Sequence, residues 1–199
     1  MEHRDFCQLI KRRIQKSIEV KANLMDNIAI IDEIARLIIE AYRSGKKAVL
    51  FGNGGSAADA QHIAAELAGK YYMDRKPLPA EALTVNTSTL TAIGNDYGFE
   101  QVFARQLEGL GNPGDIAIGI STSGNSPNVI EGIRAAKRKG MITIGLTGAD
   151  GGQLKNEVDY CICVPSQDTP RIQEVHILIG HIWCELIERA LFGDETQED

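Results

Sequence analysis

Two pairs of side chains occur at spacings that would let them act together. His62 and Glu66 are four residues apart in a segment with helical character, so they would share one helix face. Gln173 and His181 are eight residues apart in a later helical segment, about two turns along roughly one side. Imidazole nitrogens with amide and carboxylate oxygens suit zinc or a similar divalent ion. Spacing alone leaves two interpretations open, a metal site between facing helices or ordinary polar residues of the surface and core.

The segment that leads to His62 has the composition of an anion-binding turn. An apolar run ends at Phe51, and residues 52–56 then read GNGGS. The glycines allow a sharp turn and a close approach of the backbone to a ligand. We expect Ser56 to cap the helix that follows, whose first free N–H groups and dipole favour a phosphate. The loop therefore predicts an anion cradle directly before the helix that carries His62 and Glu66.

A second loop of related design follows a later apolar run, and residues 120–127 there read ISTSGNSP. We expect Ser126 to be the N-cap of the next helix and Pro127 its first residue. Hydroxyl donors, backbone N–H groups and the helix dipole can together hold a phosphate dianion without a lysine. An ordinary capped helix is the alternative, but a cap needs only one of the hydroxyls in this loop. The hydroxyl-bearing residues are Ser121, Thr122, Ser123 and Ser126.

A nucleotide-binding interpretation is weaker. Gly52, Gly54 and Ala57 fit the looser G-x-G-x-x-A form of the dinucleotide fingerprint. However, the acidic residue expected after the second strand to bind a ribose is missing, because residues 85–87 read VNT. The chain also has no G-x-x-x-x-G-K-[ST] loop for ATP. Two loops rich in glycine and serine are better explained by a sugar phosphate.

Short apolar runs alternate with helical patterns along most of the chain. We expect strands at 48–51, 82–85, 116–120, 141–146 and 160–164, and helices at 56–70, 87–110, 126–139, 151–156 and 171–192. This alternation implies right-handed crossovers and a parallel sheet covered on both faces. In the order 2-1-3-4-5, the first and third strands are neighbours where the connections reverse direction. The two loops would then form one pocket.

The N-terminal segment is helical by its apolar spacing, from Phe6 to about Tyr42, as two helices or one bent helix joined near residues 26–27. Basic residues beside the apolar stripe are also compatible with a membrane or nucleic-acid surface, but we favour packing against another subunit. We expect residues 1–45 to be an oligomerisation segment and 46–192 the main domain. Residues 193–199 read as an acidic tail.

Composition limits the possible partners. A chain of 199 residues with 43% hydrophobic residues can bury the core of one domain, and its net charge of -6 disfavours nucleic acid or an anionic membrane. No apolar run approaches the roughly 20 residues of a membrane span, and the N-terminus lacks the apolar core of a secretory signal. Four dispersed cysteines without a C-x-x-C pair favour reduced thiols. We therefore expect a cytoplasmic protein.

The longer motifs support a specific resemblance. The informative stretches are residues 52–62 (GNGGSAADAQH) with Glu66, 94–96 (GND), 121–126 (STSGNS), and 171–174 (RIQE) with His181. In these the sequence resembles the phosphoheptose isomerases of the sugar-isomerase (SIS) domain family, over essentially the whole chain. The resemblance implies a three-layer, flavodoxin-like α/β fold with a central five-stranded parallel sheet, helices on both faces and an N-terminal helical extension.

The resemblance also implies an activity, the isomerisation of sedoheptulose 7-phosphate to D-glycero-D-manno-heptose 7-phosphate through an enediol, in the synthesis of bacterial ADP-heptose and lipopolysaccharide core precursors. It implies one zinc ion per active site, with His62, Glu66, Gln173 and His181 as ligands. Glu66 would move the carbon-bound proton and His181 the oxygen-bound protons. The roles of Glu66 as zinc ligand and as base are in tension, because a carboxylate bound tightly to zinc is a poorer base.

The resemblance further implies where the substrate binds. The expected contacts are Asn53, Gly54, Gly55, Ser56, Glu66, Asn95, Asp96, Ser121, Thr122, Ser123, Ser126 and Gln173. The second loop would hold the phosphate, and residues 53–56 would shape the sugar side. Without the resemblance, Asn95 and Asp96 would be interpreted as part of a turn.

Relatives of this kind are homotetramers whose active sites lie at subunit interfaces, so the resemblance predicts the same here. The main alternative is a non-catalytic SIS-domain protein, similar to the one that associates with the replication initiator. A pure scaffold would not require the complete set of metal ligands, which favours the enzyme.

Overall fold

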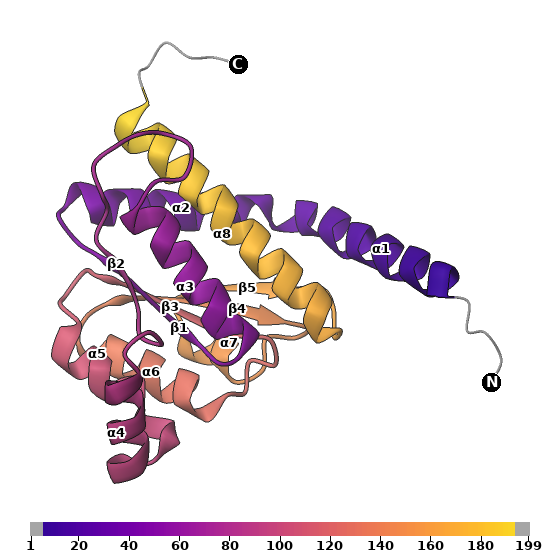
Figure 1. Cartoon of the computed structure of the whole chain (residues 1–199). Helices are drawn as coiled ribbons and strands as arrows, with labels where there is room; N and C mark the ends of the chain where they lie inside the picture. Colours follow the sequence, from indigo (N-terminus) through magenta and orange to yellow (C-terminus); the bar gives the residue numbers. More distant parts are fainter. Residues whose placement is uncertain (1–5, 194–199) are drawn as a thin grey trace.

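Five parallel strands form the middle of three layers in the computed structural model, which describes residues 6–193 (Figure 1). The strands are β1 (Ala48–Gly52), β2 (Ala80–Ala82), β3 (Ile116–Ser121), β4 (Ile142–Gly148) and β5 (Tyr160–Val164). Their order is β2-β1-β3-β4-β5, so the expected topology and fold class are confirmed. Gly52 lies opposite Ile120 in the register of β1 and β3, which places the two predicted loops at the same edge of the sheet.

Helices cover both faces of the sheet, with α2, α3 and α8 on one face and α4 to α7 on the other (Figure 1). The helices are α1 (Phe6–Ala22), η1 (Asn23–Asn27), α2 (Ile28–Arg43), α3 (Gly55–Ala68), α4 (Thr87–Tyr97), η2 (Phe99–Gln101), α5 (Ala104–Leu110), α6 (Pro127–Arg138), α7 (Leu154–Glu157) and α8 (Thr169–Phe192). The strand side chains alternate between these layers. Leu50 packs towards α3 and α8, whereas Val49 and Phe51 pack towards α5 and α6.

Two predicted elements differ from the structure. Strand β2 ends at Ala82, so the expected strand at 82–85 is displaced, because the chain turns there and Asn86 caps α4 by accepting from the Thr89 N–H at 3.0 Å. The expected helix at 87–110 is divided into α4, η2 and α5. The break falls at Gly98, whose φ of +89° is incompatible with a right-handed helix.

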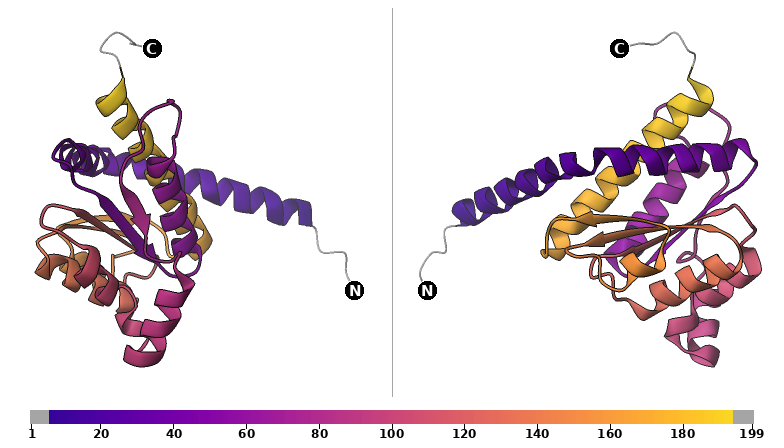
Figure 2. Two further views of the ribbon diagram at one scale, coloured as in Figure 1. Left: turned by 60° about the vertical axis from the view of Figure 1, so that its left-hand side comes forward. Right: turned by 180° about the vertical axis from the view of Figure 1, so that it is seen from behind.

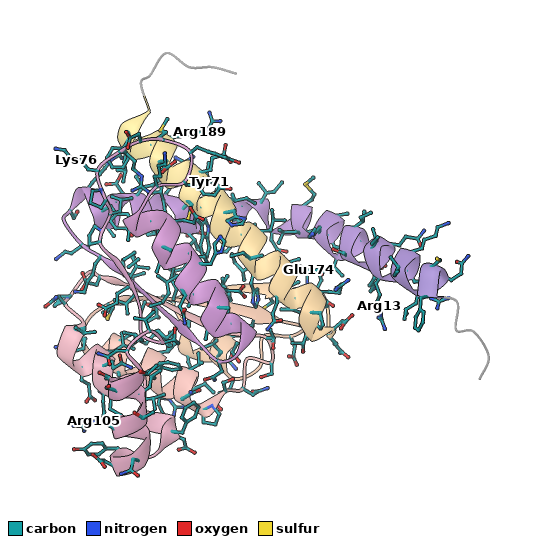
Figure 3. The ribbon with its side chains drawn as sticks, viewed as in Figure 1. Arg13, Tyr71, Lys76, Arg105, Glu174 and Arg189 are labelled. Atoms are coloured by element: carbon teal, nitrogen blue, oxygen red, sulfur yellow. The ribbon has the colours of Figure 1, made fainter. Side chains whose placement is uncertain are left out.

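Helix α1 extends away from the rest of the molecule, as both views of Figure 2 show. No other part of the described chain covers its apolar stripe. The exposed fractions of the stripe residues are 64% for Phe6, 57% for Ile10, 56% for Ile14 and 62% for Ile18. The start of α8 contacts the second half of α1, where the Ser17 hydroxyl donates to the Glu174 carboxylate at 2.6 Å. Figure 3 labels Glu174 on α8. The expected acidic tail lies outside the described residues, apart from Gly193. Between residues 6 and 193, no helix combines the length and apolar character that crossing a membrane requires.

Candidate functional site

The two glycine-containing loops meet at the carboxyl edge of β1 and β3. The side-chain amides of Asn53 and Asn128 each donate to the other's oxygen at 2.8 Å, which joins the loop after β1 to the first turn of α6. This pair leaves Asn53 one further amide hydrogen for a ligand. Asn128 is 3% exposed. Its only signal in the sequence is its place two residues after a helix cap, and sequence reasoning did not identify it.

The first loop departs from the prediction at Ser56. Helix α3 begins at Gly55 with Gly54 as its N-cap, in a left-handed conformation with φ of +55°. Ser56 is turned inward, 4% exposed, and therefore does not cap the helix as expected. The predicted cap was wrong because the helix starts earlier than the serine. No side chain caps the N-terminus of α3, but the N–H groups of residues 56–58 already donate to the carbonyl oxygens of Asn53 and Gly54. Gly55 is therefore the helical residue whose N–H is left for an anion.

The second loop leads into a helix that starts where predicted, but its serine hydroxyls make different hydrogen bonds from those expected. Ser126 is the N-cap residue of α6 and Pro127 its first residue, as expected. The Ser126 hydroxyl pairs with the Ser121 hydroxyl at 2.9 Å and makes no hydrogen bond to the helix N–H groups. Gly124 has a φ of +65°, and its carbonyl accepts from the Leu154 N–H at 2.8 Å. The hydrogen bond from Leu154 fixes the position of the loop. The N–H groups of Val129 and Ile130 donate to the Ser126 carbonyl oxygen, which leaves that of Asn128 in the first turn of α6 for an anion.

A cavity of about 930 Å³ opens beside this loop. Thr122 and Ser123 line it, together with Asp168 and Thr169 at the start of α8 and Lys16 of α1. Lys16 and Asp168 were not anticipated, although an aspartate directly before Thr-Pro is a typical start of a helix. His62, Glu66 and His181 are not among the described residues that line it. The cavity therefore borders the second loop and is separate from the cluster described next.

The other half is a cluster of His62, Glu66 and His181. The two Nε2 atoms of His62 and His181 are 3.0 Å apart, and the Nε2 of His62 is 3.3 Å from Oε1 of Glu66. One ligand atom from each residue lies within 4.8 Å of the others. Tetrahedral zinc with bonds of about 2.0–2.1 Å separates its ligand atoms by roughly 3.3 Å. The spacing and the donor types therefore fit a divalent ion.

Helices α3 and α8 create this cluster by approaching closely. A Cβ at Gly180 would lie 2.5 Å from the Cδ1 and Cγ1 atoms of Ile63, so only glycine permits the contact. Gln173, two turns before His181, packs on the start of α3, where a Cβ at Gly55 would lie 2.3 Å from its Nε2. Gln173 thus lies along the same helix pair, next to the first loop. Its role as a fourth ligand stays a prediction.

Two further side chains border the cluster. Tyr71, in the segment after α3, stacks on His181 with ring centroids 5.6 Å apart. Asp59, one turn before His62, has a buried Oδ2 without a hydrogen-bond partner among the described residues. Burial raises the pKa of Asp59 to about 6, and the nearby His62 opposes the rise. Sequence reasoning gave neither a role: Tyr71 lies outside the quoted motifs, and Asp59, although within the stretch 52–62, was not separated there from its neighbours.

Asn95 and Asp96 are not brought to the cluster within one chain. They lie in the last turn of α4 and are exposed, and the Asn95 amide donates to Asp96 at 2.8 Å. Figure 1 and both views of Figure 2 place α4 at the far side of the sheet from α8. Their predicted contact with the sugar remains a prediction.

Comparison with known proteins defines the family. The SIS domain family matches residues 10–148. The phosphoheptose isomerase of Sulfurimonas denitrificans is 57% identical over 188 residues, which cover 93% of this chain and 96% of the relative. The chain belongs to the phosphoheptose isomerase family of SIS-domain proteins. The relative named phosphoheptose isomerase 2 in Campylobacter jejuni is 52% identical and covers 92% and 93% of the two chains.

Solved structures of the phosphoheptose isomerase family have the same fold. The phosphoheptose isomerase of Neisseria gonorrhoeae is 43% identical with a TM-score of 0.88, over 92% of this chain and 98% of that one. The Francisella tularensis structure is 38% identical with a TM-score of 0.89 and the same coverage. Both similarities cover 92% of this chain, so they extend beyond the five-stranded sheet to the helices around it.

His176 of this phosphoheptose isomerase family member is a packing residue and does not belong to the cluster of His62, Glu66 and His181. His176 is fully buried on α8, and its Nε2 is 3.0 Å from the Thr147 carbonyl oxygen, to which the neutral ring donates. Burial lowers the pKa of His176 to about 4, although the hydrogen bond to Thr147 opposes the shift. The neutral imidazole is thus the form that the fold stabilises.

The depressed pKa of His176 predicts acid sensitivity. The unfolded chain, with a histidine pKa near 6.5, binds this proton more readily than the folded chain, so the stabilisation is complete above that pH and is lost as the pH falls towards 4. We expect the free energy of unfolding to fall by about 2 kcal/mol between pH 7 and pH 5 from this residue alone. Urea titrations of wild type and His176→Gln measure it. A variant with the same pH dependence as wild type would contradict the assignment.

Proposed function

We propose that the chain is an aldose–ketose isomerase that converts sedoheptulose 7-phosphate to D-glycero-D-manno-heptose 7-phosphate, in the supply of bacterial heptose precursors. The observation that carries this proposal is the convergence of His62, Glu66 and His181 within 4.8 Å, beside two loops suited to a phosphate. Relatives named phosphoheptose isomerase at more than half sequence identity support the choice of substrate. The four cysteines are free thiols, which supports work in the reducing cytoplasm.

The reaction moves one hydrogen between neighbouring carbons. In our proposal the Glu66 carboxylate takes the proton from C1 of the open-chain ketose, and the C1–H electron pair forms the C1–C2 double bond of the enediol. His181 transfers protons between the two oxygens, so that O2 gains one and O1 loses one. Glu66 then returns its proton to C2, and the C1 carbonyl of the aldose forms. General acid–base catalysis of this kind contributes about 10²–10⁴-fold.

A zinc ion fits the donor set, and His62, Glu66, Gln173 and His181 would hold it. When bound, such an ion supplies Lewis acidity at the sugar carbonyl oxygen and a fixed point for the open-chain substrate. His62 is the residue whose Nε2 is close to both Glu66 and His181, which supports its role as the central ligand. If one carboxylate oxygen of Glu66 held the ion, the other would remain free to act as the base.

The phosphate is assigned to the second loop. In our proposal Ser121, Thr122, Ser123 and Ser126 hold it at the N-terminus of α6, where the N–H groups of Val129 and Ile130 already donate to the Ser126 carbonyl oxygen and Asn128 has the remaining N–H of the first turn. Residues 53–56 and Gln173 contact the sugar between this loop and the cluster. Ser56 can contribute only a rotated hydroxyl, since its side chain is buried and its backbone N–H donates to the Asn53 carbonyl oxygen at 3.0 Å.

Removal of the metal tests the proposed function. Wild-type protein supplied with sedoheptulose 7-phosphate should form the aldose and incorporate solvent deuterium, and a chelator should lower the rate roughly 100-fold or more, because Lewis-acid catalysis contributes several kcal/mol. Added zinc should restore it. Product analysis by NMR measures both. Zinc binding without aldose formation would instead favour the non-catalytic alternative.

The assembly is the second part of the proposal. We propose a homotetramer in which a second copy covers the stripe of α1 and the apolar groove of about 390 Å³ between η1, α2 and α8. Met25 and Ile28 border this groove and are 69% and 59% exposed in the single chain. Exposed apolar surface of this kind is typical of subunit interfaces. Native mass spectrometry should give a tetramer for the full chain, and a dissociated, inactive protein after removal of residues 1–22. An active tetramer after truncation would contradict this.

A further inference from the structure

A buried ion pair lies at the opposite end of α3 from the first loop. The Nε of Arg75 is 2.8 Å from Oε1 of Glu188, and both side chains are 1% exposed. Arg75 belongs to the irregular segment between α3 and β2, and Glu188 lies near the end of α8. In Figure 3 this segment arches over α8, with Tyr71 against the helix and Lys76 further along the arch. The pair therefore joins a long connection to two helices.

The Glu188 carboxylate fixes the first part of this segment. It accepts the backbone N–H groups of Tyr71, Tyr72 and Met73 at 2.7, 2.8 and 3.0 Å, in addition to Arg75. Burial alone would raise the pKa of Glu188, but these N–H donors and the Arg75 charge outweigh it and lower the pKa. Glu188 is therefore an anion that holds three consecutive backbone groups.

The Arg75 guanidinium fixes the end of α3. Its Nη2 donates to the Glu66 carbonyl oxygen at 2.9 Å, and its Nη1 donates to the carbonyl oxygens of Leu67 at 2.8 Å and Gly69 at 3.2 Å. These carbonyls belong to the last turn of the helix and its C-cap, where hydrogen-bond partners are missing and a cation is favoured. One guanidinium thus binds the backbone of Glu66 itself.

Arg75 and Glu188 each fix the backbone of one residue that lies next to His181. Glu66 is anchored through its carbonyl by Arg75, and Tyr71, which stacks on His181 with centroids 5.6 Å apart, is anchored through its N–H by Glu188. We propose that Arg75 and Glu188 are positioning residues, which keep Glu66 and Tyr71 aligned with His181. This inference rests on the proposed function, since Glu66 and His181 are the reacting and metal-binding groups there.

Stability alone is a weak explanation of this pair. A buried ion pair gains little over apolar residues of similar volume, because both charges lose their hydration. Apolar side chains, however, could not bind three N–H groups of one segment and the carbonyls of a helix end at once. The fully satisfied network specifies one position of the backbone around Glu66.

The chain contains a matched control at the other edge of the sheet. Asp115 is a buried carboxylate that pairs with Lys47 and accepts the backbone N–H groups of Lys47 at 3.2 Å and Asn112 at 3.0 Å. Its side chain is 3% exposed. It precedes β3, at the amino edge of the sheet, whereas the site lies at the carboxyl edge. Asp115→Asn therefore removes a similar charge without touching the cluster.

The test compares Glu188→Gln and Arg75→Lys with Asp115→Asn in the full chain, at a temperature at which circular dichroism shows each folded. We expect both former variants to lose about 10-fold or more in zinc affinity by calorimetry, as changes around metal ligands typically do. Their kcat should fall with little change in KM, because the phosphate loop is untouched. Asp115→Asn should lose thermal stability and keep its zinc affinity and kcat.

Zinc affinity is measured without substrate, so it judges the positioning role even if the proposed isomerisation fails. Should Glu188→Gln not fold, Arg75→Lys decides, since it keeps the charge but cannot reach the same carbonyls. Variants with reduced stability but wild-type zinc affinity and kcat would overturn the proposal. A wild-type chain that turns over substrate but binds no zinc would overturn the metal assignment, and the kcat comparison then decides the positioning role.

Discussion

Glu66→Gln is expected to abolish isomerisation and solvent-deuterium exchange while sugar-phosphate binding survives. The amide keeps the size of the side chain and an oxygen that can still bind a metal, but it cannot accept a proton from carbon. Loss of the base removes at least about 10²–10⁴-fold of the rate. NMR of the substrate in deuterated water measures exchange and product together, and calorimetry with inorganic phosphate measures the binding that remains.

Glu40→Gln is the matched control, because Glu40 is also a helical carboxylate. It pairs with Arg43 at 2.7 Å on the surface of α2, away from the cluster. It should isomerise like wild type. If Glu66→Gln exchanged deuterium at the wild-type rate, Glu66 would not be the base. Loss of exchange together with loss of zinc would instead show that Glu66 acts chiefly as a ligand, which is the tension noted between its two roles.

Gly124→Ala is the second substitution with a large expected effect. A Cβ there would lie 2.0 Å from the Gly151 carbonyl oxygen, and the φ of +65° is itself unfavourable for alanine. The clash is with backbone, so the loop must move. We expect the free energy of unfolding to fall by about 2–4 kcal/mol and phosphate affinity to fall roughly 10-fold or more. Urea denaturation and calorimetric titration with inorganic phosphate measure the two effects.

Gly109→Ala provides the comparison. Gly109 lies inside α5 with nothing within 4 Å of an added Cβ, so alanine should stabilise by about 0.5–1 kcal/mol and leave phosphate binding unchanged. Phosphate binding by Gly124→Ala that matched the Gly109→Ala protein would contradict the placement of the phosphate in the second loop.

Much of the architecture could be predicted from local patterns. Continuous apolar runs such as 116–120 identify buried parallel strands, and the alternation with helical segments predicts right-handed crossovers and helices on both faces. The order of the strands was an assumption supported by the family resemblance, and the structure confirms it. Pro127 after Ser126 marks a helix start because both preferences act within one turn. The same local reasoning failed at Ser56, where Gly54 and Gly55 let the helix begin before the serine.

The sequence by itself determined the buried strands, the glycine- and serine-containing loops that follow two of them and the helical spacing of His62 with Glu66, because these depend on neighbours within a few residues. Only the tertiary structure decided which distant groups meet. His62 and His181 are 119 positions apart, Asn53 and Asn128 are 75 apart, and Arg75 and Glu188 are 113 apart. Such contacts depend on how closely whole helices approach, as Gly180 permits against Ile63, and the local pattern along the chain does not contain that distance.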